Sequence, residues 1–210
     1  METKPKIRPY ADAPRLPGEG KVDVRKLNEK ACGRIEIEIG PGRGGFLLER
    51  LAAVPDLCMV GFEIRRKWAT IVDGRLRKHG YGARGRVFAE DAKQALERLE
   101  PDGSVDAFFV HFPDPWWKKR HQKRLVMSPS LLDSIARLLR QGGELYVQTD
   151  VEERAEAYEA QVNAHPAFAP AGDEEGSARM AENPYQARSP REHRAIADGI
   201  PIVRLRFRKL

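Results

Sequence analysis

The chain has 210 residues, of which 37 are Lys or Arg and 31 are Asp or Glu, so the formal net charge is 37 − 31 = +6. This length fits one large domain or two small ones. No stretch approaches the roughly 18 apolar residues of a membrane helix, and the N-terminus lacks the apolar segment of a signal peptide. The positive charge suggests a polyanionic partner, although a charged surface without a partner explains it equally well.

The cysteines and histidines argue against a disulfide-rich or metal-binding protein. Cys32 and Cys58 are too few for a disulfide scaffold, and Cys58 lies in an apolar run that is typical of a small core residue. The five histidines show no zinc-ligand spacing, and there is no G-x-S-x-G hydrolase elbow. We therefore expect a soluble, cytoplasmic protein of a reducing compartment, with no metal and no membrane partner.

Strand and helix patterns alternate along the chain. Residues 1–33 are rich in Pro, Lys and Arg and are expected to form a basic, loosely ordered N-terminal arm with one short helix near residues 24–29. The elements expected after it, in chain order, are strand 34–39, helix 46–54, strand 57–62, helix 64–79, strand 86–88, helix 92–99, strand 105–112, helix 128–139, strand 144–148, helix 151–163, an irregular loop 173–182 and strand 200–207. This order predicts a single α/β domain over residues 34–210, built on a doubly wound, mostly parallel sheet.

A glycine cluster follows the first predicted strand, at the edge of the sheet where α/β proteins bind ligands. Gly40, Gly42 and Gly44 let the backbone turn sharply and approach a ligand closely. Glu63 ends the second strand about twenty residues further on, where an acidic residue binds ribose hydroxyls. This pattern fits a nicotinamide dinucleotide and S-adenosylmethionine equally well, and a plain strand–helix turn remains an alternative.

Three acidic residues favour S-adenosylmethionine. Glu38 lies two residues before the glycines, where its carboxylate can reach the ammonium of a methionine moiety but would repel a pyrophosphate. Asp91 follows the third strand, where it either meets an adenine amino group or caps the next helix. Asp114 lies between two prolines that fix the backbone, and Trp116 after it offers a stacking face for a base. A merely rigid turn is the competing interpretation of this last motif.

Basic residues gather in a few stretches. Residues 64–86 hold eight Lys or Arg and one acid, and residues 188–210 hold seven and two, whereas residues 151–176 hold one Arg and seven acids. A basic run is usually a solvated helix face. The run Lys118-Lys-Arg-His-Gln-Lys-Arg124 differs because it begins two residues after Trp116, at the predicted site, where it would meet nucleic-acid phosphates. The phosphate contacts expected there are Lys119, Arg120, Lys123 and Arg124.

From about Ile35 to Leu210 the sequence resembles the bacterial tRNA (guanine-N7)-methyltransferases. The motifs that carry the resemblance are Glu38-Ile-Gly-Pro-Gly-Arg-Gly44, Gly61-Phe-Glu-Ile64, Asp91-Ala92, Phe112-Pro-Asp-Pro-Trp-Trp-Lys-Lys-Arg-His121, Lys123-Arg124, Gly142-Gly143, Thr149-Asp150 and Ser189-Pro-Arg-Glu192. The most specific of these is the run from Phe112 to His121. The family usually has threonine at the position of Ser189 and rarely a proline next, so this segment departs from the family pattern at Ser189 and Pro190.

The resemblance implies a Rossmann-like methyltransferase fold with an antiparallel C-terminal strand. It implies methyl transfer from S-adenosylmethionine to N7 of a guanine in the tRNA variable loop, at position 46, with S-adenosylhomocysteine as the other product and no obligatory protein partner. Asp114 would be the catalytic carboxylate. The cofactor would contact Glu38, Gly40, Gly42, Gly44, Glu63, Asp91 and Asp114, and the substrate would contact Lys118, Asp150, Ser189, Arg191 and Glu192.

Two other functions fit parts of this pattern. A methyltransferase of the same fold could act on another RNA base or on a small molecule, but the basic runs argue against a small substrate. A non-catalytic RNA-binding protein of the same fold is the second alternative, and the intact glycine loop with Glu38, Glu63 and Asp114 argues against it.

Overall fold

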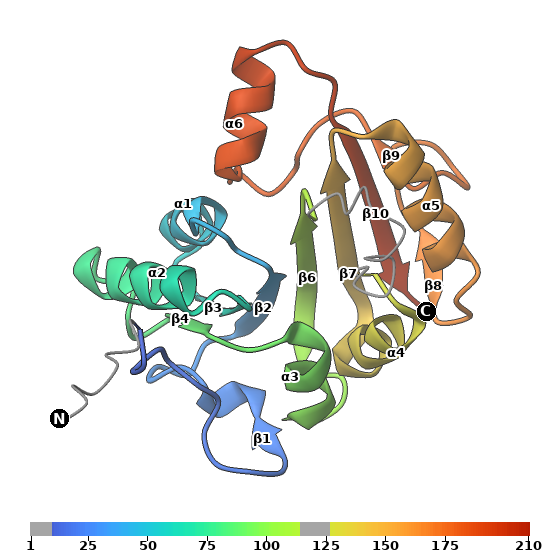
Figure 1. Cartoon of the computed structure of the whole chain (residues 1–210). Helices are drawn as coiled ribbons and strands as arrows, with labels where there is room; N and C mark the ends of the chain where they lie inside the picture. Colours follow the sequence, from blue (N-terminus) through green and yellow to red (C-terminus); the bar gives the residue numbers. More distant parts are fainter. Residues whose placement is uncertain (1–9, 114–126) are drawn as a thin grey trace, which may run out of the picture.

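The computed structural model describes residues 10–113 and 127–210, and Figure 1 shows how they are arranged. Their elements, in chain order, are β1 (Val22–Asp23), the 3₁₀ helix η1 (Val24–Lys26), β2 (Arg34–Ile39), α1 (Gly45–Ala53), β3 (Leu57–Phe62), α2 (Arg66–Lys78), β4 (Gly85–Phe88), α3 (Ala92–Arg98), β5 (Leu99–Glu100), β6 (Val105–His111), α4 (Pro129–Leu138), β7 (Leu139–Thr149), α5 (Glu152–Asn163), β8 (Phe168–Pro170), β9 (Arg179–Met180), α6 (Pro190–Ala197) and β10 (Val203–Lys209).

One large sheet organises the described residues, with the strand order β4-β3-β2-β6-β7-β10-β8 and β9 paired to β10. The five strands from β4 to β7 are parallel, and β10 runs antiparallel to β7 and β8. This topology confirms the predicted α/β class, the mostly parallel sheet and the antiparallel C-terminal strand. Successive parallel strands are joined through helices, as the right-handed βαβ crossover requires.

Helices cover both faces of the sheet. One core cluster lies under α1 and α2, and a second lies under α3, α4 and α5. Successive side chains of β6 belong alternately to the two clusters. Phe109 belongs to the first cluster, and Phe108 and Val110 belong to the second. A strand buried on both faces needs apolar residues at nearly every position, which explains the continuous apolar run that predicted β6.

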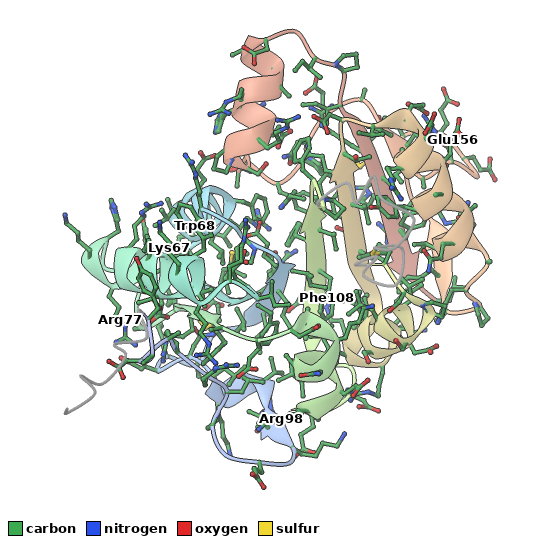
Figure 2. All side chains as sticks on the ribbon, viewed as in Figure 1. Lys67, Trp68, Arg77, Arg98, Phe108 and Glu156 are labelled. Atoms are coloured by element: carbon green, nitrogen blue, oxygen red, sulfur yellow. A yellow bond between two sulfur atoms is a disulfide. The ribbon has the colours of Figure 1, made fainter. Side chains whose placement is uncertain are left out.

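The described part of the N-terminal segment, residues 10–33, is packed more firmly than a loosely ordered arm. Its apolar side chains are buried in the second core cluster, the one under α3, α4 and α5; they are Leu16, Val22, Val24 and Leu27. The short strand β1 pairs with β5, and the expected short helix shrinks to η1. Arg98 of α3, labelled in Figure 2, donates to the carbonyls of Pro17, Gly18 and Gly20 and so fixes the chain that leads into β1. The domain boundary at residue 33 remains a prediction.

Cys32 and Cys58 form a disulfide, which corrects the expectation that Cys58 is simply a small core residue. Cys58 is 3% exposed, so its predicted burial is confirmed. The pairing arises from the register of β2 against β3, in which Arg34 lies opposite Leu57. The residues just before β2 therefore lie beside the start of β3, a proximity that sequence spacing does not show.

The C-terminal third differs most from the prediction. Helix α6 was not predicted, and β9 lies inside the expected loop 173–182. β10 begins at Val203 rather than at residue 200, because Pro201 has no N–H to donate to a strand ladder. β7 begins at Leu139 instead of residue 144, through a register shift against β6 between Val105 and Ala107. All other predicted strand and helix boundaries from β2 onward lie within two residues of the observed ones.

Candidate functional site

The candidate site lies where the strand order reverses. From β2 the chain adds β3 and then β4 on one side of the sheet. It then crosses over to β6, which lies next to β2 on the other side. Open α/β sheets bind their ligands in the crevice beyond the carboxyl ends of two such strands. In Figure 1 the arrows of β6 and β7 point toward this end, and α6 lies beyond them close to α1.

The glycine loop between β2 and α1 has the left-handed backbone that the sequence predicts. The φ angles of Gly40, Gly42 and Gly44 are 70°, 54° and 72°. A Cβ on Gly44 would lie 2.2 Å from Val72 Cγ1, so this glycine lets α2 pack against the start of α1. A Cβ on Gly40 would meet no atom of the described chain within 4 Å. The loop is therefore tightly packed at its helix end and open at its strand end.

Glu38 is buried at the end of β2, with an exposed fraction of 2%. Its Oε1 accepts a hydrogen bond of 2.9 Å from Nδ1 of His111, the last residue of β6. Its Oε2 is also buried and has no hydrogen-bond partner within the described residues. A buried carboxylate oxygen without a donor is costly, so this atom fits a site that a cationic ligand group completes.

Glu63 closes the other side of the glycine loop. Its Oε2 accepts the Gly42 N–H at 3.0 Å, and its Oε1 accepts the backbone and side-chain N–H groups of Arg65, both at 2.9 Å. The residue is 2% exposed. The carboxylate thus holds the loop in shape, and Arg65 Nη2 also lies 3.4 Å from its Oε2. The predicted contact of Glu63 with ribose hydroxyls remains a prediction.

Asp91 caps helix α3. Its side chain accepts the backbone N–H of Lys93 at 2.9 Å, which is the capping role that competed with adenine binding in the sequence interpretation. The cap occupies Oδ1 only. Contact with adenine remains a prediction, and it would use the other carboxylate oxygen of Asp91, Oδ2.

The C-terminal motif reaches the glycine loop through helix α6. Ser189 caps this helix by accepting the N–H of Glu192 at 3.2 Å, and Pro190 occupies its first turn. Pro190 packs so closely on the start of α1 that a Cβ on Gly45 would lie 2.6 Å from its Cγ. Arg191 forms an ion pair with Asp150, just beyond β7. The structure therefore brings Asp150, Ser189 and Arg191 together, as the predicted substrate site requires.

Glu192 belongs to the same motif but is fully buried, with an exposed fraction of 0%. Its Oε1 lies 3.3 Å from Nη2 of Arg204, and its Oε2 accepts a hydrogen bond of 2.9 Å from Asn183. Both oxygens thus bind groups of the protein. This carboxylate anchors α6 to β10, and burial together with the nearby Glu192 charge raises the pKa of Tyr146.

The remaining predicted site residues lie outside the described part of the chain. These are Asp114, Lys118, Lys119, Arg120, Lys123 and Arg124. Their roles stay predictions from the sequence.

Two features of this site were not predicted. His111 was part of an apolar run and was interpreted as ordinary strand, although a polar residue at the carboxyl end of a buried strand is itself a signal. Helix α6 was also missed, although Ser189-Pro190-x-Glu192 places a cap residue, a first-turn proline and a Glu three residues after the cap, which together predict a helix start.

The glycine loop and the acidic residues at the switch point are the features from which the sequence predicts a methyltransferase site. The described residues contain no group of three metal-ligating side chains. Within residues 10–113 and 127–210, no helix combines the length and apolar composition that a bilayer span requires. The sequence predicts that Glu38, Gly40 and Glu63 contact S-adenosylmethionine, and among the described residues nothing bonds Glu38 Oε2 or lies within 4 Å of a Cβ on Gly40.

Comparison with known proteins supports the methyltransferase class and then identifies a family within it. Residues 33–205 match a family model described as putative methyltransferase. The fold is similar to that of a SAM-dependent O-methyltransferase from Thermotoga maritima, with a TM-score of 0.54 and 18% identity over 85% of this chain and 60% of that one.

Curated relatives then identify the family. A tRNA (guanine-N(7)-)-methyltransferase of Anaeromyxobacter dehalogenans is 41% identical over 89% of this chain and 91% of its own length. One of Myxococcus xanthus is 34% identical over 84% of each chain. The chain belongs to the tRNA (guanine-N(7)-)-methyltransferase family.

Proposed function

We propose that this protein transfers a methyl group from S-adenosylmethionine to N7 of a guanine in tRNA, at position 46 in the variable loop. The observation that carries the proposal is the buried Glu38 carboxylate with its unpartnered oxygen, next to an open glycine loop at the switch point of the sheet. Its curated relatives bear the name of this activity, and the Phe112–His121 motif is the most specific sequence feature behind it. Because its proposed substrate is a tRNA, we also propose that the protein acts in the cytoplasm.

The cofactor supplies an electrophilic methyl group on a sulfonium. Guanine N7 carries an in-plane lone pair that is free at neutral pH, so the protein needs no general base to activate it. Its residues must instead hold N7, the methyl carbon and sulfur in line, which makes alignment the main catalytic effect. Glu38 and Glu63 would hold the two ends of the cofactor beside the glycine loop, and Asp114 is the proposed catalytic carboxylate.

Asp150 is the better candidate of the two C-terminal carboxylates for contact with guanine. The purine gains positive charge as it is methylated, and a carboxylate nearby stabilises that charge. The Glu192 oxygens are occupied by Arg204 and Asn183. The Asp150 side chain is 14% exposed and paired with the half-exposed Arg191, which tRNA phosphates can attract away. We therefore assign guanine contact to Asp150 and a structural role to Glu192.

Helix α2 adds a second basic surface beside the site. Its one acid, Asp73, is buried and paired with Arg77 and Arg86, so the exposed face of the helix carries only positive charge. Lys67 and Arg43 lie 5.6 Å and 5.4 Å from the ring centre of Trp68, which joins an aromatic face to two cations. Figure 2 shows Lys67, Trp68 and Arg77 across the molecule from the acidic helix α5.

Salt dependence tests the tRNA partner. If the basic run at 118–124 and α2 together neutralise about five phosphates, log K against log salt should slope by roughly −3.5 to −4.5. Lys67→Gln should make that slope less steep by about 1. Glu156→Gln on α5 is the matched control and should leave it unchanged. A nearly flat slope for the parent protein would contradict a tRNA partner.

Cofactor and catalytic residue are tested separately. S-adenosylmethionine at about one hundred times its Kd should stabilise the protein by about 2.7 kcal/mol, whereas NAD should not.

Asp114→Asn should abolish methyl transfer into tRNA and leave tRNA binding largely intact. Turnover within a few-fold of the parent would overturn the assignment of Asp114. Binding of tRNA without any methyl transfer by the parent would favour the non-catalytic alternative.

A further inference from the structure

A row of buried polar side chains crosses the sheet beneath α1 and α6. Its members lie on adjacent strands and are each no more than 9% exposed: Glu38 on β2, His111 on β6, Gln148 on β7 and Arg204 on β10. His111 is paired in register with Gln148, and Gln148 with Arg204. Polar groups in a core are almost always hydrogen-bonded, so the polar atoms of this row are expected to have hydrogen-bond partners.

The unmet hydrogen bonds of the row lie on its three parallel strands, β2, β6 and β7. At the far end Arg204 is satisfied by Glu192 and by the carbonyl of Ala181. At the near end four buried atoms have no partner within the described residues: Glu38 Oε2, His111 Nε2 and both side-chain polar atoms of Gln148. The row is therefore complete at Arg204 on β10 and incomplete from Gln148 to Glu38, whose strand leads into the glycine loop.

The orientation of His111 is fixed by its surroundings. Its ring centre lies 4.3 Å from that of Phe46 on α1 and 5.8 Å from that of Phe109 on the same strand. Its Nδ1 lies 2.9 Å from Glu38 Oε1, and both side chains are 3% exposed. Because a carboxylate can only accept, Nδ1 carries the proton of this bond. The imidazole thus holds one oxygen of Glu38 and leaves the other without a protein partner.

We propose that His111 is a positioning residue for the cofactor: by donating to Glu38 Oε1, it orients the carboxylate so that Oε2 receives the ammonium of the methionine moiety. This inference rests on the proposed function, in which Glu38 binds that ammonium. Hydrogen bonds to an ionised group are shorter and stronger than neutral ones, and the buried carboxylate has no other donor among the described residues. Loss of the imidazole therefore weakens the cofactor site through Glu38 alone.

The test measures S-adenosylhomocysteine binding by calorimetry, because this reaction product has no methyl group to transfer and binds without reacting. His111→Phe keeps a ring in the aromatic cluster but removes the donor, and should raise the Kd about tenfold or more. His111→Asn places an amide N–H near the position of Nδ1 and should restore the Kd to within about threefold of the parent. Tyr146→Phe is the matched control, because it lies in the same cluster but has no bond to Glu38. It should leave the Kd unchanged, and all three variants should unfold cooperatively.

A double-mutant cycle separates positioning from general damage. If His111 acts through Glu38, then His111→Phe added to Glu38→Gln should weaken binding no further. Independent, additive losses would overturn the proposal, as would an unchanged Kd for His111→Phe alone or an equal loss in Tyr146→Phe. A parent protein that does not bind S-adenosylhomocysteine would overturn the proposed function itself, and a Glu38→Gln variant that binds normally would remove the premise about Glu38.

Discussion

Two alanine substitutions in the glycine loop should both lower stability, Gly44→Ala by more, whereas Gly40→Ala should weaken cofactor binding. Gly40 and Gly44 have nearly the same left-handed backbone, with φ angles of 70° and 72°, so alanine is strained by about 1–2 kcal/mol at either position. Their surroundings differ. The new methyl group would meet nothing within 4 Å at Gly40 but would lie 2.2 Å from Val72 Cγ1 at Gly44.

This difference sets the magnitudes. Carbon atoms pack at about 3.5–4.0 Å, so the contact with Val72 forces α1 and α2 apart and adds about 1–3 kcal/mol to the strain. Gly44→Ala should therefore lower the free energy of unfolding by about 2–5 kcal/mol, and Gly40→Ala by about 1–2 kcal/mol. The open space beside Gly40 is where we place the cofactor, so Gly40→Ala should weaken S-adenosylhomocysteine at least about tenfold despite its milder effect on folding.

Urea denaturation and calorimetry on the two variants check both halves of this prediction. Equal losses of stability would contradict the close packing of Gly44 against Val72. Normal affinity in Gly40→Ala would refute the placement of the cofactor against the strand end of the loop.

Three further predictions concern groups around the site. Arg50→Met should lower the free energy of unfolding by about 3 kcal/mol in urea denaturation, because Glu36 is fully buried and keeps only its contact with Arg34; a loss below about 1 kcal/mol would contradict this. Burial, and then the neighbouring carboxylate of Glu144, raise the pKa of Tyr185, so the folded protein keeps this proton to higher pH than the unfolded chain. That contribution is fully present below about pH 10 and is lost above it, so Tyr185→Phe should lose less stability than the parent between about pH 9 and 11, and equal losses would refute the assignment. Asp91→Ala should cost about 1 kcal/mol through the lost cap, and an unchanged S-adenosylhomocysteine affinity would rule out adenine contact.

Local patterns predicted the elements from β2 to α4 well, apart from the short β5, because each predicted element there has a self-contained signal. The alternating isoleucines of β2 and the apolar run of β6 reflect burial on two faces, and the glycines reflect positive φ angles. The carboxylates at the strand ends follow from the same logic, because parallel strands bring their carboxyl ends to one edge. These rules need no knowledge of which strands are neighbours.

Features that depend on tertiary neighbours were not predictable in this way. The Cys32–Cys58 disulfide depends on the register of β2 against β3, and the burial of Glu192 depends on how α6 meets β10. The bond between His111 and Glu38 joins residues 73 positions apart, and only the adjacency of β2 and β6 brings them together. Helix α6 is different, because its capping residues were present in the sequence and were interpreted as a binding segment instead.

Basic and acidic residues are segregated in space as well as in sequence. The basic helix α2 lies beside the glycine loop, whereas the acidic helix α5 lies on the other side of the sheet (Figures 1 and 2). A polyanion is therefore drawn toward the edge of the molecule that carries the proposed site. The net charge of +6 averages over these two regions and understates the difference between them.

Product mapping tests the central claim most directly. The protein is incubated with S-adenosylmethionine and an unmodified tRNA transcript, and the methylated nucleotide is located by cleavage at 7-methylguanosine and by mass spectrometry. We predict one methyl group on N7 of the guanine at position 46 in the variable loop. A methyl group on another atom or another base, or an unmodified tRNA, would contradict the proposed function.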